Sequence, residues 1–86
     1  MPTVGRIGAI QIRFYYEDHG TPHFHAISPD FDFKFSIADG SVVSGNGRIR
    51  GRELALIRAW VRQHREALLF NWQRARDAEP LQDIED

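Results

Sequence analysis

The sequence predicts an α+β domain in which an antiparallel sheet of four or five strands packs against a C-terminal helix or two helices. Two patterns support this prediction. Apolar and polar residues alternate through residues 9–16 and 31–37, as in strands that are buried on one face only. Between residues 51 and 77 apolar residues instead recur at spacings of three and four, as on one side of a helix. Strands followed by helix favour two packed layers.

The strands follow one another closely enough to form an antiparallel meander. The expected strands are residues 4–7, 9–16, 22–28, 31–37 and 41–44. Asp39-Gly40 is a strong signal for a tight hairpin turn between the last two strands, because both residues tolerate the backbone torsions of such turns. Gly45-Asn46-Gly47 is then expected to end the last strand and to mark the change from sheet to helix.

The helical segment carries the apolar stripe that would cover the sheet. Pro80 is expected to end it, because the proline ring cannot continue a helix and disfavours helical torsions at Glu79. A break at His64 would divide the segment in two, but no glycine or proline forces one, so both alternatives stay open. The predicted core comprises Ile10, Ile12, Phe14, Phe33 and Phe35 from the sheet and Leu54, Ile57, Val61, Leu68 and Trp72 from the helical segment.

Length and composition limit the class of protein. The 86 residues fit one domain, which we place at residues 1–78, followed by an acidic, flexible tail at residues 79–86. The absence of cysteine excludes disulfides, thiolate nucleophiles and zinc–thiolate sites. No apolar run reaches the roughly 18 residues of a membrane span and no signal pattern opens the chain, so we expect a cytoplasmic protein with no membrane contact. A domain this small would gain useful burial from a partner or from a homodimer.

Charge is nearly balanced in total but unevenly distributed. The formal net charge is −1, which argues against strong non-specific binding of nucleic acid. The segment from Arg48 to Arg65 holds six arginines and one acid, and we call these arginines the arginine band. The segment from Asp77 to Asp86 holds five acids and no base. Three interpretations stay open: a complementary pair within the chain, a nucleic-acid surface beside an unrelated tail, or a solvated helix face with a solvated end.

The candidate site is the stretch from Tyr15 to His25, which holds three of the four histidines. Residues 17–22 are rich in turn formers, so the stretch is expected to run strand, turn, strand. His23 and His25 are two residues apart and therefore leave an extended strand on the same face, opposite Phe24. With Phe24 in the core, the outer face of the sheet would gather Arg13, Tyr15, His23, His25, Asp32 and Lys34.

These residues carry a resemblance to a known family. The chain matches the pattern Tyr-x-x-Asp-His-x-x-Pro-His-x-His at Tyr15, Asp18, His19, Pro22, His23 and His25. With Arg6-Ile7-Gly8 before the motif and Trp72 after it, residues 1 to 76 resemble a family of small bacterial proteins catalogued as a domain of unknown function. Members of that family are often encoded beside a second small protein. The resemblance therefore implies a toxin-antitoxin-like pair with a small cognate protein partner.

One hypothesis for the motif is a metal site. His23 and His25 offer imidazole nitrogens on one side of a strand, and the turn would add a third ligand, with water as a fourth. Such a set suits a divalent transition metal: zinc, nickel or iron(II). The metal ligands would be drawn from Asp18, His19, His23 and His25.

A second hypothesis is ribonuclease chemistry without a metal. Cleavage by a 2′-hydroxyl needs a general base and a general acid, which His23 and His25 would supply near pH 7. The phosphate needs positive charge, which Lys34 or Arg13 would supply. Tyr15 would stack on a base.

A third hypothesis makes the motif structural and the protein a binding module. The histidines would hydrogen-bond across a tight turn, as satisfied histidines commonly do. The domain would act by docking the cognate protein, with RNA or DNA as the alternative partner. Short domains without a recognisable catalytic signature more often bind than react, so we expect a protein that acts through protein contact and carries a histidine-rich surface site. Whether it is also an enzyme stays open.

Overall fold

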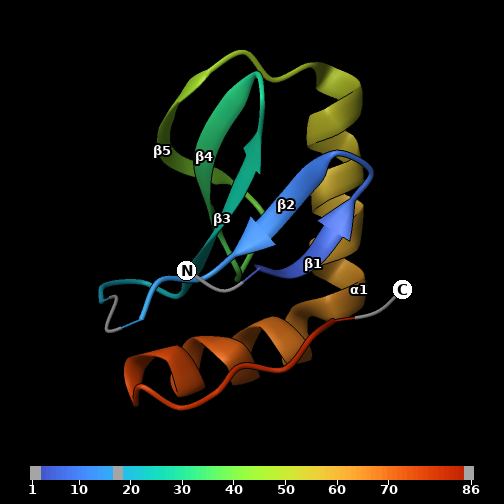
Figure 1. The fold of residues 1–86 in the computed structure, drawn as a ribbon. Helices are drawn as coiled ribbons and strands as arrows, with labels where there is room; N and C mark the ends of the chain where they lie inside the picture. Colours follow the sequence, from blue (N-terminus) through green and yellow to red (C-terminus); the bar gives the residue numbers. More distant parts are fainter. Residues whose placement is uncertain (1–2, 17–18, 85–86) are drawn as a thin grey trace.

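The structure of the protein, a computed structural model, describes residues 3–16 and 19–84. Five strands lie in chain order in one antiparallel sheet, and one long helix follows them (Figure 1). The elements are β1 Thr3–Ile7, β2 Ile10–Arg13, β3 His23–Ser28, β4 Phe31–Ser36, β5 Val42–Gly47 and α1 Gly51–Arg76. The predicted α+β class, with an antiparallel sheet and a C-terminal helix, is confirmed.

The end of the sheet differs from the prediction. Gly45-Asn46-Gly47 does not mark a change to helix but forms the second half of β5, so that prediction is wrong. Gly45 has a φ of 139°, and a Cβ there would lie 2.3 Å from the backbone oxygen of Asp32. Gly47 has a φ of 106°, and a Cβ there would lie 2.4 Å from the backbone oxygen of Asp30. Glycine is required at both positions because β5 passes so close to the backbone of β4.

α1 is a single helix with a bend. His64 has φ −118° and ψ 21°, which lie outside the helical region, although neither proline nor glycine is present to cause a kink. Figure 1 shows that the helix runs beside the sheet before the bend and turns beneath the end of the sheet after it. We call residues 51–63 the first arm and residues 65–76 the second arm. The helix is therefore continuous, with its bend at the position where a break was considered.

The core lies between one face of the sheet and α1. It comprises Val4, Ile10, Ile12, Phe14, Phe24, Ala26, Phe31, Phe35, Ile37, Ile57, Trp60, Val61, Leu68, Trp72 and Ala75. Of the ten predicted core residues, Phe33 and Leu54 are only partly buried and pack at its margin. No helix in the described part of the chain combines the length and the apolarity needed to cross a bilayer.

The segment after α1 returns to β1. Ile84 donates its backbone N–H to the carbonyl of Val4, with 2.6 Å between nitrogen and oxygen. Leu81 and Ile84 pack against the core. An ion pair joins Glu79 to Arg74 at 3.7 Å. These contacts attach the described part of the predicted tail, residues 79–84, to the domain, while residues 85 and 86 lie outside the described part.

Candidate functional site

The strand register places four polar side chains in one row across the sheet. Arg13 on β2 pairs with His25 on β3. His25 also pairs with Lys34 on β4, which in turn pairs with Ser44 on β5. Paired residues of antiparallel strands project to the same face, and here it is the face opposite the one packed on α1. We call Arg13, His25, Lys34 and Ser44 the cross-strand row.

A shallow hollow of about 200 Å³ lies beside the cross-strand row. Tyr15 forms one wall, because its ring meets the ring of His25 edge on, with 4.2 Å between the ring centroids. The hollow is lined by Tyr15, His25, Asp32, Lys34, Ser44, Gly45 and Asn46. Ser44 and Asn46 were not among the predicted site residues. Asn46 was missed because the last strand was expected to end at residue 44. Ser44 was missed because only the pairing of β5 with β4 places it opposite Lys34, as it places Asn46 opposite Asp32.

Arg13 is held in place by neutral groups. Its Nε donates to the side-chain oxygen of Gln11 at 2.9 Å and lies 3.1 Å from the hydroxyl of Thr3, and its terminal nitrogen also donates to Gln11. None of these acceptors carries a negative charge, so these contacts do not compensate the positive charge of the guanidinium. With Lys34 and one carboxylate, that of Asp32, this edge of the outer face is weakly cationic.

The two histidines of β3 have different environments. His23 is 6% exposed, its Nδ1 lies 2.8 Å from the carbonyl oxygen of Thr21, and its ring centroid lies 4.8 Å from that of Trp72. A carbonyl only accepts, so Nδ1 of His23 is the donor. His25 is only partly buried and lines the hollow. The second arm of α1 therefore covers His23 but leaves His25 at the outer face.

The described residues include no cluster of three potential metal ligands. Among residues 3–16 and 19–84, no three histidine, aspartate or glutamate side chains lie close enough together to hold a metal ion. His19 is exposed in the connection between β2 and β3. Asp18, the other predicted ligand from that connection, lies outside the described residues. The metal hypothesis therefore gains no support from the described geometry.

The two edges of the sheet differ. β1 is one edge, and the hydrogen bond from Ile84 to Val4 attaches the C-terminal segment to it. β5 is the other edge, and all six of its residues are exposed. Val42 and Val43 are 42% and 56% exposed. β5 thus presents both backbone and apolar side chains to solvent, beside the hollow that Ser44 and Asn46 line.

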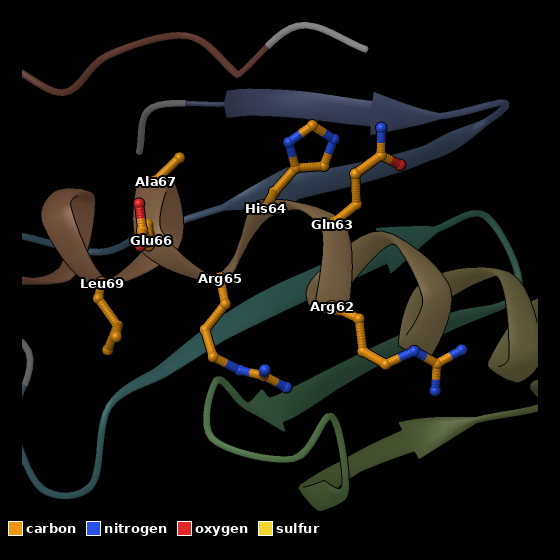
Figure 2. A pocket seen from close by; sticks show the side chains of 7 residues that line it. All are labelled: Arg62, Gln63, His64, Arg65, Glu66, Ala67 and Leu69. Atoms are coloured by element: carbon orange, nitrogen blue, oxygen red, sulfur yellow. The ribbon is translucent and has the colours of Figure 1, made fainter.

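A second, larger hollow of about 620 Å³ lies at the bend of α1. It is lined by Arg62, Gln63, His64, Arg65, Glu66, Ala67 and Leu69 (Figure 2). Arg65 and Arg58 belong to the arginine band, and both bind the turn between β4 and β5. Arg65 donates to the carbonyl of Ile37 at 3.2 Å and Arg58 to that of Gly40 at 3.3 Å. In the sequence, this pair of contacts corresponds to two arginines seven residues apart, a spacing that places them on one side of a helix.

Comparison with known protein families gives one result. A family model described as Domain of unknown function (DUF4160) matches residues 9–73. Comparisons with curated proteins and with solved structures found no significant match. The matched range contains β2 to β5, the cross-strand row and most of α1.

Proposed function

The chain belongs to this family of domains of unknown function, and from that premise we propose that it is one component of a toxin-antitoxin-like two-protein system. In this proposal it acts through contact with a small cognate protein, which adds an extended segment to β5. The supporting observation is the difference between the two sheet edges. β1 is attached to the chain's own C-terminal segment, whereas every residue of β5 is exposed.

An uncovered edge strand is a template for another strand. Its unpaired N–H and C=O groups accept the main chain of a partner, and exposed side chains select which partner binds. Val42 and Val43 supply that apolar selection. The register between β4 and β5 skips Val43, so this residue has no Cα partner on β4. Its 56% exposed side chain is the most accessible large apolar group of the strand.

The experiment is co-expression with the protein encoded by the neighbouring gene, followed by titration calorimetry of the purified pair. We expect a complex in the native protein and an affinity reduced by about tenfold or more in Val43→Lys, because a charged edge residue opposes strand addition. Leu56→Lys is the matched control, since Leu56 is similarly exposed, at 48%, but belongs to α1 and not to the edge strand. Equal affinities of the two variants would contradict docking at β5, and absence of any complex would reject the two-protein proposal. Self-association of the purified chain, lost in Val43→Lys, would make a second copy the partner.

A second candidate function is RNA cleavage without a metal, and the cross-strand row favours it. The row places the imidazole of His25 between two cations, Arg13 and Lys34, beside the ring of Tyr15. In this reaction the 2′-oxygen of RNA bonds to phosphorus while the bond from phosphorus to the 5′-oxygen breaks. A base takes the 2′-hydroxyl proton, and an acid gives one to the 5′-oxygen. The cations stabilise the charge that develops on the phosphate.

The burial of His23 revises which residues would act. His25 is the base in this candidate function, and Lys34 or Tyr15 is the acid, because His23 lies under Trp72 and outside the hollow lining. Cleavage of labelled single-stranded RNA should fall by about 100-fold or more in His25→Ala and Lys34→Ala. His19→Ala is the control, because His19 is exposed outside the hollow. RNA cleavage that survives both substitutions would remove this candidate.

A further inference from the structure

The bend in α1 opens the larger of the two hollows described above. At the bend the ring of His64 packs against that of Trp60, with 4.6 Å between centroids, while the helix changes direction. The non-helical torsions of His64 allow this change of direction. The second arm therefore turns beneath the end of the sheet (Figure 1). The hollow of about 620 Å³ lies at the surface where the helix bends.

Two arginines, Arg62 and Arg65, line the hollow, and a third, Arg58, precedes them on α1. Arg58, Arg62 and Arg65 follow each other at spacings of four and three, so they lie along one side of α1. Figure 2 shows Arg62 and Arg65 extending to the same side of the helix. Hydrogen bonds to the carbonyls of Ile37 and Gly40 hold Arg65 and Arg58 through their Nε atoms. We call these three residues the arginine ridge; two of them bind the turn that leads into β5.

The described hydrogen bonds of the arginine ridge go to backbone carbonyls and not to acidic side chains of the chain. In the described tail, Glu79 pairs with Arg74, and Asp77 accepts a hydrogen bond from Gln73 at 3.2 Å. Both partners lie on the second arm, beyond the ridge. The interpretation of the band and the tail as a complementary pair within one chain therefore finds no support among residues 3–16 and 19–84.

The remaining residues that line the hollow indicate which of two anionic ligands, an acidic peptide or a nucleic acid, fits it better. Leu69, an apolar residue of this lining, is 43% exposed beside the arginines. An apolar rim suits a peptide, which brings carboxylates together with apolar side chains. Glu66 in the lining and the net charge of −1 oppose a nucleic-acid backbone, whose affinity depends on a dense positive surface. The chemistry fits an acidic peptide segment better than RNA.

The ridge also continues the open edge of the sheet. Gly40, whose carbonyl binds Arg58, lies two residues before Val42, the first residue of β5. We propose that the arginine ridge receives an acidic stretch of the same partner segment that pairs with β5. A strand added to β5 passes out of the sheet at the Val42 end and there meets Arg58, Arg62 and Arg65. This inference rests on the proposed function, and it specifies the chemistry of the partner.

The test uses the full chain and labelled peptides in a fluorescence anisotropy titration. One half of each peptide alternates threonine with valine, and the other half is a run of glutamates, placed at the C-terminal end in one peptide and at the N-terminal end in another. Antiparallel pairing with β5 brings a C-terminal run to the ridge, and parallel pairing brings an N-terminal one. Matched peptides carry glutamine in place of glutamate. We expect one glutamate peptide to bind at least about tenfold more tightly than its glutamine counterpart, with an affinity that falls as salt rises.

Charge reversal identifies the residues. Arg62→Glu should remove the advantage of the glutamate peptide, whereas Arg76→Glu, an exposed arginine at the end of α1, should leave it unchanged. Glutamate and glutamine peptides of equal affinity, or no binding by either, overturn the inference. So does binding of single-stranded polyuridylate that Arg62→Glu abolishes while the peptides do not bind. If Val43→Lys disrupts the complex with the cognate protein and Arg62→Glu does not, the proposed function stands and the acidic segment is rejected.

Discussion

Asn71 and Gln82 are joined by two hydrogen bonds. The side-chain nitrogen of Asn71 donates to the carbonyl of Gln82, and its side-chain oxygen accepts the backbone N–H of Gln82, both at 2.9 Å. Asn71 is fully buried on the second arm of α1. Its amide thus binds both backbone polar groups of Gln82, in the segment that returns to β1.

Asn71→Ala should lower the free energy of unfolding by about 2–3 kcal/mol, because both hydrogen bonds and the buried volume are lost. Urea denaturation measures this change, and amide exchange at Ile84 should accelerate in parallel, since the segment loses its attachment. Gln73→Ala is the control: Gln73 is exposed and only bonds exposed Asp77, so we expect a change within about 0.5 kcal/mol. Equal effects of the two substitutions would show that the pair does not hold the segment.

The histidines of β3 should separate stability from function. His23→Ala should destabilise the domain by about 2 kcal/mol, because it removes the contact with Trp72 and the hydrogen bond to Thr21. His25→Ala, at the partly exposed outer face, should cost less than about 1 kcal/mol. Thermal unfolding by circular dichroism compares them. A larger loss in His25→Ala than in His23→Ala would contradict the assignment of His23 to the packed interior.

The difference between these histidines marks a limit of sequence inference. Their spacing correctly placed both on one face of a strand, and alternation correctly placed Phe24 in the core. The burial of His23 depends on Trp72, which lies 49 positions later in the numbering and reaches His23 only because α1 bends. No local pattern contains that contact. A site read from spacing alone therefore assigned equal roles to two unequal residues.

Registers and strand ends show the same limit. Alternating residues predicted the strands, but the cross-strand row required knowledge of which residues pair, and Ser44 enters it only through β4. Gly45 and Gly47 were interpreted as the end of the last strand and the change to helix, because glycine is common where regular elements end. They are glycine for a different reason, the close passage of β5 against backbone atoms of β4. Composition is identical in the two cases, and only the tertiary structure distinguishes them.

Gly45→Ala should be strongly destabilising. The added Cβ would lie 2.3 Å from a backbone oxygen and 2.6 Å from the Cα of Phe33, neither of which yields as a side chain would, and the φ of 139° is strained for alanine. We expect a loss of at least about 2 kcal/mol by urea denaturation. Gly51→Ala is the matched control. Gly51 begins α1, and a Cβ added there would meet no heavy atom within 4 Å, so this substitution should be neutral or stabilising. Similar effects at the two positions would refute the close passage of β5.

The β4–β5 turn carries a pH-dependent contribution. Asp39 accepts hydrogen bonds from the hydroxyl of Ser41 at 2.7 Å and from its backbone N–H at 3.0 Å. These bonds, the hydroxyl one foremost, hold the pKa of Asp39 below its ordinary value of 3.8. A carboxyl with a lowered folded pKa stabilises the fold above its unfolded pKa, and this stabilisation is lost as the pH falls through the folded pKa.

Asp39→Asn should therefore be less stable than the native protein near neutral pH and similar to it once Asp39 is protonated. Urea midpoints of both proteins at about pH 6 and about pH 2 measure the difference. Ser41→Ala should reduce the same pH dependence, since it removes the leading hydrogen bond. A stability difference that is constant across this range would show that Asp39 does not contribute through its charge.

Ala78, two residues after the end of α1, is poorly suited to its backbone torsions. Ala78 has a φ of 55°, donates to the carbonyl of Ala75 at 3.2 Å, and is followed by Glu79, which donates to the carbonyl of Arg74 at 2.8 Å. This pair of hydrogen bonds is the Schellman motif, which usually has glycine at the left-handed position that Ala78 occupies here. Glycine is favoured because it has no Cβ and so avoids the steric penalty of left-handed torsions. Ala78→Gly should therefore raise the free energy of unfolding by roughly 0.5–1 kcal/mol. Ala59→Gly, at an exposed position inside α1, should instead lower it by about 1 kcal/mol. Urea denaturation measures the free energy of unfolding of both variants. If this free energy falls in both, Ala78 adopts its left-handed torsions without strain.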